Sequence, residues 1–158
     1  MKTLRIQIKT ISRTPPLGGL VSAELSFRLN GFSFPAEDWV DSPIVVLRWW
    51  AEAVASLMRT PSIPVEARFM EGPYLVQFRA VTMESWQADF VEAGLNRRSV
   101  HTAEFDAKTF VDSLVEACYR ALELCSDNVS VLADATQLTN ALAILETAVG
   151  SVRNGRKT

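Results

Sequence analysis

Residues 20–58 read LVSAELSFRLNGFSFPAEDWVDSPIVVLRWWAEAVASLM, and this stretch decides the fold. Apolar and polar residues alternate from Leu20 to Leu29, which is the period-two pattern of a strand with one buried face. Asn30-Gly31 then predicts a hairpin turn, because a type I′ turn needs a positive φ at both central residues. A short return strand over residues 32–34 completes the predicted hairpin.

A helix is predicted shortly after this hairpin. Ser42 suits the N-cap and Pro43 the first helical position, where a missing N–H costs nothing. Trp49 and Trp50 point about 100° apart on such a helix, so one belongs to the core and the other to its flank. The sequence does not decide which of the two is exposed. The expected core face is Ile44, Leu47, Trp50, Ala51, Val54 and Met58, and the expected solvent face is Arg48, Glu52, Ser56 and Arg59, with Arg48 and Glu52 paired.

The rest of the chain adds strands and two further helices. Alternation and turn signals predict strands over 4–9, 65–70, 74–81, 84–91 and 100–105, with loops at 15–19 and a basic turn at 94–99. Asp106 is expected to cap a helix over 107–125, and residues 126–128 break it before a last helix ending at Gly150. The apolar seam expected between these two helices includes Val131, Ala135, Leu138, Leu142, Leu145 and Val149.

These elements predict an α+β fold. Its antiparallel meander sheet has about five to seven strands, one helix is inserted after the first hairpin, and two C-terminal helices pack on the sheet. Residues 1–150 form a single domain on this interpretation, and residues 151–158 form a polar tail. A chain of 158 residues with 48% hydrophobic and 22% charged content suits one globular domain.

Composition also limits where the protein works. No apolar run approaches the roughly 20 residues that cross a bilayer, and the N-terminus lacks the apolar core of a signal peptide, so we expect a cytoplasmic protein without membrane contact. Cys118 and Cys125 lie seven residues apart on one predicted helix. That is about 10.5 Å of rise, too far for a disulfide, so both are expected to be buried free thiols.

Charge is distributed unevenly along the chain. Residues 1–20 hold four basic and no acidic residues, whereas residues 99–150 hold eight acidic and two basic residues. This asymmetry predicts either an acidic interaction surface or simply solvated helix faces. Because the isoelectric point is near 5.5 and no dense basic face is evident, nucleic acid is not an expected partner.

Catalytic equipment is sparse. His101 is the one histidine, and no nucleophile elbow, P-loop, dinucleotide turn or H-E-x-x-H motif occurs. Glu37, Asp38 and Asp41 cluster before the first helix, where negative charge also favours a helix N-terminus. We therefore expect a protein that is not an enzyme and that uses no metal or other cofactor.

Residues 32–41, FSFPAEDWVD, followed by LRWW at 47–50, resemble small immunity proteins of bacterial polymorphic and contact-dependent toxin systems. In many of these a hairpin with a similar Phe-Ser-Phe-Pro return leads into Trp-x-Asp and an amphipathic helix. The resemblance covers residues 20–58, and the remaining α+β layout only loosely. It implies a non-enzymatic inhibitor that binds a cognate toxin domain, often a nuclease, and blocks its active site.

The charge map supplies the candidate contact surface for such a partner. Acidic side chains can mimic phosphate and steer association with a basic enzyme. A small-molecule-binding domain with a cleft between the sheet and the first helix, lined by Trp and Phe, stays open as an alternative, as does a structural or homo-oligomeric module. The candidate partner-binding residues are Glu37, Asp38, Asp41, Glu116, Glu123 and Asp134.

Overall fold

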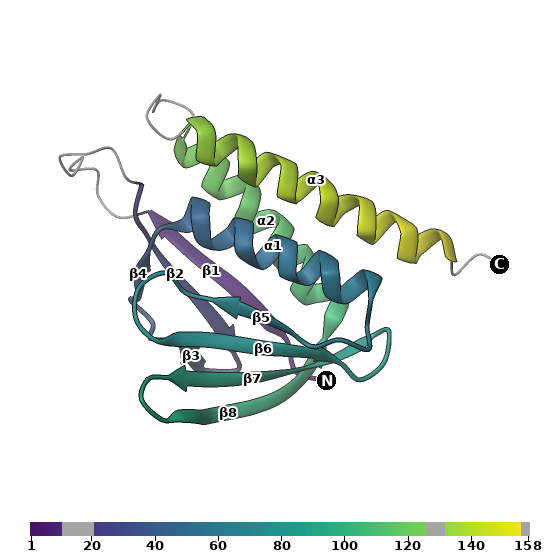
Figure 1. Cartoon of the computed structure of the whole chain (residues 1–158), viewed down its shortest axis with the longest axis horizontal. Helices are drawn as coiled ribbons and strands as arrows, with labels where there is room; N and C mark the ends of the chain where they lie inside the picture. Colours follow the sequence, from purple (N-terminus) through teal and green to yellow (C-terminus); the bar gives the residue numbers. More distant parts are fainter. Residues whose placement is uncertain (11–20, 126–131, 156–158) are drawn as a thin grey trace.

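The computed structural model describes residues 1–10, 21–125 and 132–155. Figure 1 shows two antiparallel sheets beside a layer of helices, so the predicted α+β class is confirmed. The described residues form eight strands instead of the predicted five to seven, and these strands make two four-stranded sheets instead of one meander. In chain order the elements are β1 (Leu4–Thr10), β2 (Ala23–Leu29), β3 (Phe32–Phe34), β4 (Val40–Asp41), α1 (Pro43–Arg59), β5 (Val65–Arg68), β6 (Tyr74–Ala80), β7 (Ser85–Ala93), β8 (Arg97–Asp106), α2 (Ala107–Cys125) and α3 (Leu132–Gly155).

Sheet 1 is built around β2. Strand β1 pairs with one edge of β2, and the short strands β3 and β4 both pair with the other edge. Asn30 has a φ of 45° and Gly31 a φ of 85°, so the predicted hairpin turn between β2 and β3 is confirmed. The outer edge of β1 is covered by α2, where the Ser113 hydroxyl accepts a hydrogen bond of 2.9 Å from the Ile6 N–H.

Sheet 2 is a meander in the order β5-β6-β7-β8. Strand β8 begins at Arg97, so the basic turn predicted over 94–99 is wrong for its last three residues. The register shifts between Phe90 and Val91, which breaks the alternation that would have revealed the longer strand. A parallel bridge between Lys2 and Phe105 joins this sheet to the chain just before β1.

Aromatic rings join the two sheets and the helices into one core. Phe27 of β2 lies at its centre and stacks on Trp50 of α1, with ring centroids 4.3 Å apart. The same ring meets Phe78 of sheet 2 edge-on at 5.9 Å and lies 6.3 Å from Phe110 of α2. Such offset and edge-to-face contacts stabilise a core beyond the area they bury. The inner faces of both sheets and two helices therefore share one apolar interior.

Helix α1 is covered on two sides. Trp50 is 1% exposed and its Nε1–H donates to the Arg68 carbonyl at 2.7 Å, while Trp49 lies half-buried on the flank. Arg48 was expected on the solvent face, paired with Glu52. The structure places it under α3 instead, where its guanidinium donates to the side-chain oxygen of Gln137. That pairing prediction is wrong because α3 packs across α1 as well as α2 (Figure 1).

The ends of the last two helices match the predictions only in part. Asp106 caps α2, because its Oδ1 accepts the Thr109 N–H at 2.7 Å, as predicted. Helix α3 continues past Gly150 to Gly155, so the predicted end is wrong. Gly150 lacks the left-handed φ that a C-terminal glycine adopts. The predicted loop at 15–19, the break at 126–128, Val131 and the last three residues of the tail lie outside the described residues.

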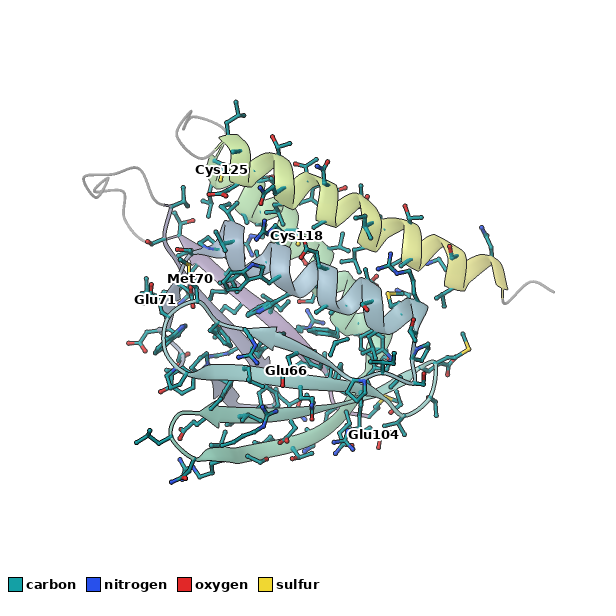
Figure 2. All side chains as sticks on the ribbon, in the orientation of Figure 1. Glu66, Met70, Glu71, Glu104, Cys118 and Cys125 are labelled. Carbon is teal, nitrogen blue, oxygen red and sulfur yellow. The ribbon has the colours of Figure 1, made fainter. Side chains whose placement is uncertain are left out.

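Both cysteines lie on α2 and are buried free thiols, as predicted (Figure 2). Burial raises the pKa of Cys118 to about 12, with a smaller contribution from the Glu146 charge. Burial also raises the pKa of Cys125, assisted by Asp134. Both thiols are therefore protonated at neutral pH. Within the described parts of the chain, no helix is both long and apolar enough to span a membrane.

Candidate partner-binding surface

The three acids before α1 do not form one surface. Asp41 is only 2% exposed. Its Oδ1 accepts the Ser42 N–H at 2.8 Å, and its Oδ2 accepts the Met70 and Glu71 N–H groups at 3.2 Å each. The Trp39 indole N–H also donates to Oδ2, at 3.3 Å. The Asp41 carboxylate is thus buried and hydrogen-bonded within the fold, so it is not available for the partner contact predicted for it.

The same carboxylate changes how α1 begins. Ser42 occupies the predicted N-cap position, but its side chain makes no capping hydrogen bond. Asp41 instead joins the start of α1 to the loop between β5 and β6, where Figure 2 labels Met70 and Glu71. This arrangement fixes the corner at which the two sheets meet the first helix.

Glu37 and Asp38 remain exposed beside this corner. Glu37 pairs with Arg28 of β2 at 3.1 Å, so part of its charge is already compensated. Both acids lie in the β3–β4 loop, at the edge of sheet 1 opposite β1. Since α2 covers the β1 edge, these two acids and the acids of α2 belong to different faces of the molecule.

Helix α2 carries a more coherent acidic surface, which we call the α2 stripe: Asp112, Glu116, Tyr119 and Glu123. Successive members are four, three and four residues apart, so they lie on one helix face. All four are exposed. At the N-terminal end of the stripe, Lys108 forms an ion pair with Asp112. Two of the predicted contact residues, Glu116 and Glu123, are therefore brought together on this face.

Tyr119 occupies the middle of the α2 stripe. Its side chain is 49% exposed, and its hydroxyl donates a 2.7 Å hydrogen bond to Glu146 of α3. That bond raises the pKa of Tyr119, because it favours the neutral phenol that can donate. The contact also holds the ring in place between two helices. The Tyr119 ring is therefore held in place with the carboxylates of Glu116, Glu123 and Glu146 near it.

Asp134 lies at the other end of this surface. It is half-buried in the first turn of α3, and its charge contributes to the raised pKa of Cys125 at the end of α2. Asp134 is therefore close to the C-terminal end of α2 but less accessible than Glu116 or Glu123. Its role in partner contact stays a prediction.

The six contact residues named from the sequence leave out Asp112, Tyr119 and Glu146, although Asp112 and Glu146 both belong to the acidic segment over 99–150. The spacing of residues 112, 116, 119 and 123 was sufficient to find the first two. Glu146 could not be found in this way, because its contact with Tyr119 depends on how α3 docks on α2. Helical periodicity therefore predicts the α2 stripe, whereas Glu146 joins this surface only through the packing of α3 on α2.

His101 lies between Phe32 and Phe90, with ring centroids 4.7 and 6.0 Å away, which is an aromatic packing environment. Within 1–10, 21–125 and 132–155, no group of three histidine, cysteine, aspartate or glutamate side chains is arranged to hold a metal ion. Comparison of the chain with protein-family models, with curated proteins and with solved structures finds no match.

Proposed function

We propose that this protein is a non-enzymatic inhibitor of the immunity-protein type, which neutralises a cognate bacterial toxin domain by binding it through the α2 stripe. The observation that carries the proposal is Tyr119, exposed and held by Glu146 in the middle of the carboxylates of α2. Tyrosine is enriched among the residues that dominate interface energies. The resemblance of residues 20–58 to immunity proteins adds independent support.

Charge makes this surface selective for a basic partner. The stripe and its α3 neighbour present the carboxylates of Asp112, Glu116, Glu123 and Glu146, of which Asp112 pairs with Lys108 and Glu146 accepts the Tyr119 hydroxyl. A nuclease binds a polyanion and therefore lines its active site with positive charge. Carboxylates at such a site complement the potential and accelerate association, most strongly at low ionic strength.

The stripe stands on a rigid support. Phe110, Leu114 and Cys118 on the opposite face of α2 are fully buried. Ser113 in addition fastens the helix to β1 through the Ile6 N–H. A partner that binds here does not have to order a flexible segment, so little binding free energy is lost to conformational entropy.

The proposal is tested with a partner captured on the immobilised wild-type protein and then expressed alone. We expect the captured domain to arrest bacterial growth, and co-expression of this protein to restore it. The double variant Glu116→Lys/Glu123→Lys is expected to weaken binding by about 100-fold, equivalent to about 2.7 kcal/mol, and to abolish the growth rescue.

Two matched variants locate the surface. Glu37→Lys/Asp38→Lys makes the same charge change on the opposite edge of sheet 1 and is expected to leave rescue intact. Tyr119→Ala should weaken binding at every salt concentration, whereas the charge reversals should lose much of their effect at high salt. If the β3–β4 loop variant abolished rescue while the α2 variant retained it, the α2 stripe would not be the contact surface.

A further inference from the structure

A cleft of about 260 Å³ opens beside the N-terminal end of α2, where Asp112 of the α2 stripe lines it. Four elements form it: the last turns of α1, the hairpin between β6 and β7, the first turns of α2 and the last turns of α3. Its walls include Met58, Met83, Trp86 and Val111. The other members of the α2 stripe, Glu116, Tyr119 and Glu123, are not among the residues that line the cleft.

The cleft has the size and lining of an apolar ligand site. An apolar cavity of about 150 Å³ is enough to admit benzene. Methionine side chains adapt their shape to an apolar ligand, and three of them, Met1, Met58 and Met83, line this cleft. A shallower hollow of about 620 Å³ adjoins it and shares Met58, Met83 and Val152. The two hollows give an elongated apolar path that suits a chain better than a compact ring.

The charged groups at the cleft differ in how far they are already satisfied. Asp106 caps α2, Asp112 is paired with Lys108, and Glu84 has an interaction of its own. Arg153, which is exposed in the last turn of α3, forms no ion pair with any residue that the structure describes. Arg153 is therefore a cationic group at the mouth of the cleft with which no described carboxylate pairs. It favours an anionic group on the ligand.

We propose that this cleft binds an amphiphile with an unbranched apolar tail and a single anionic head, of the class of a medium-chain carboxylate. The tail lies against Met58, Met83 and Trp86, and the head group contacts Arg153. This assignment does not involve Glu116, Tyr119 or Glu123 of the α2 stripe and remains testable whether or not a toxin is the partner.

Three ten-carbon probes of different head-group charge test the assignment by titration calorimetry on the full chain, below the concentrations at which they form micelles. Decanoate is expected to bind at one saturable site, and decanol about tenfold more weakly. Decylamine should bind more weakly still, because Arg153 repels its head group. Equal affinity for decanoate and decylamine, or no saturable binding of decanoate, would overturn the proposal.

Variants on the rim separate the site from a general surface effect. Met83→Glu places a carboxylate on the wall and is expected to reduce decanoate affinity at least tenfold. Met70→Glu is its matched control, since Met83 is 64% exposed and Met70, outside the cleft, is 48% exposed. Arg153→Gln should bring decanoate affinity down to that of decanol and leave decanol unchanged. Thermal unfolding of each variant confirms that the fold is retained.

A second copy of the chain is the competing occupant of the same hollow. We expect wild-type protein and Met83→Glu to sediment alike at all concentrations tested. A wild-type dimer that Met83→Glu converts to a monomer would assign the cleft to self-association and overturn the ligand proposal. Equal loss of decanoate binding in Met83→Glu and Met70→Glu would also overturn the ligand proposal, because the effect would then not be specific to the cleft.

Discussion

At the scale of single residues, the Asp41 side chain joins several separate segments of the chain through hydrogen bonds. One carboxylate accepts three backbone N–H groups and an indole N–H, and these come from the β3–β4 loop, the N-cap position of α1 and the β5–β6 loop. Buried donors without an acceptor are costly, because they lose their hydrogen bonds to water and gain none in return. The side chain is therefore a structural junction.

Replacing Asp41 by alanine should lower the free energy of unfolding by about 3 kcal/mol, since several buried donors lose their acceptor together. For a chain of this length, that corresponds to a fall in Tm of about 6–12 °C. Thermal unfolding followed by circular dichroism measures the shift. Asp38→Ala, at an exposed neighbouring site, should change stability by no more than about 0.5 kcal/mol. Equal effects of the two substitutions would contradict the assigned role of Asp41.

Asp106 gives stability a dependence on pH. Hydrogen bonds from the side chain and the backbone N–H of Thr109 hold the pKa of Asp106 below its ordinary value of 3.8. A carboxyl whose pKa is lower in the folded state stabilises the protein above its unfolded pKa, and this contribution is lost as the pH falls through the folded pKa.

We therefore expect Asp106→Ala to cost about 1 kcal/mol at pH 7. The difference from wild type should shrink as the pH is lowered below about 4. Denaturant unfolding of both proteins at a series of pH values measures this difference. A gap that stayed constant, or widened, on acidification would show that the carboxylate charge does not act at the cap.

The sequence was informative for residues whose role depends on near neighbours. The cap at Asp106 and the turn at Asn30 were predicted, because their partners lie within three residues along the chain. Asp41 and Arg48 were misassigned, because their partners lie about 30 and 89 residues away. The solvent face of a helix cannot be inferred from its own pattern when a later helix covers it.

At the scale of elements, two glycine turns set the geometry of the hairpins. Gly31 has a φ of 85° with open space around its Cα. Gly72 has a φ of 70°, and an added Cβ would lie 2.9 Å from ring carbons of Tyr74 and 3.0 Å from Trp39. The second turn therefore combines backbone strain with a steric conflict, whereas the first has strain alone.

Alanine should lower the free energy of unfolding more at Gly72 than at Gly31. Gly31→Ala is expected to cost about 1 kcal/mol for the left-handed backbone, and Gly72→Ala about 1–3 kcal/mol more for the displaced rings. Gly94→Ala is the matched control, because Gly94 has no positive φ and no atom close to an added Cβ. Equilibrium unfolding in urea ranks the three variants. Similar losses at positions 31 and 72 would show that the aromatic rings move aside at little cost.

Elements were predicted well where periodicity was long and uninterrupted. The bounds of α1 and α2 match the predicted helices closely, because apolar stripes and caps agree. Strand β4 is only two residues long and carries no readable period. The α2 stripe was accessible to the same helical reasoning, although attention to acidic residues alone left out its tyrosine.

At the scale of the whole molecule, one core includes both sheets and the helices α1, α2 and α3. The inner aromatic rings belong to elements far apart in sequence, so no hairpin or helix pair retains its buried surface without the rest. The packing of one sheet on the other depends on such distant contacts. The division of the strands into two sheets was therefore not predictable from strand patterns alone. A single cooperative unfolding transition follows for a core of this kind.

Leu145→Ala in α3 tests this cooperativity. Leu145 is fully buried, and its truncation should cost about 2–5 kcal/mol through lost apolar contact and the cavity left behind. Far-UV circular dichroism and tryptophan fluorescence should shift to the same lower midpoint, because Trp50 shares the core with α3. A helical signal that melted before the fluorescence change would show that α3 unfolds as a separate unit.

The contact between Ile6 and Ser113 has a consequence for how the protein is made. The two residues are 107 positions apart. A ribosome that adds about 5–20 residues per second needs about 5–20 s to synthesise the intervening chain. During that interval the outer edge of β1 has no helix to cover it, and an open strand edge invites pairing with another chain. Arg5 and Lys9, which are exposed along this strand, supply the charge that discourages such pairing until α2 has been synthesised.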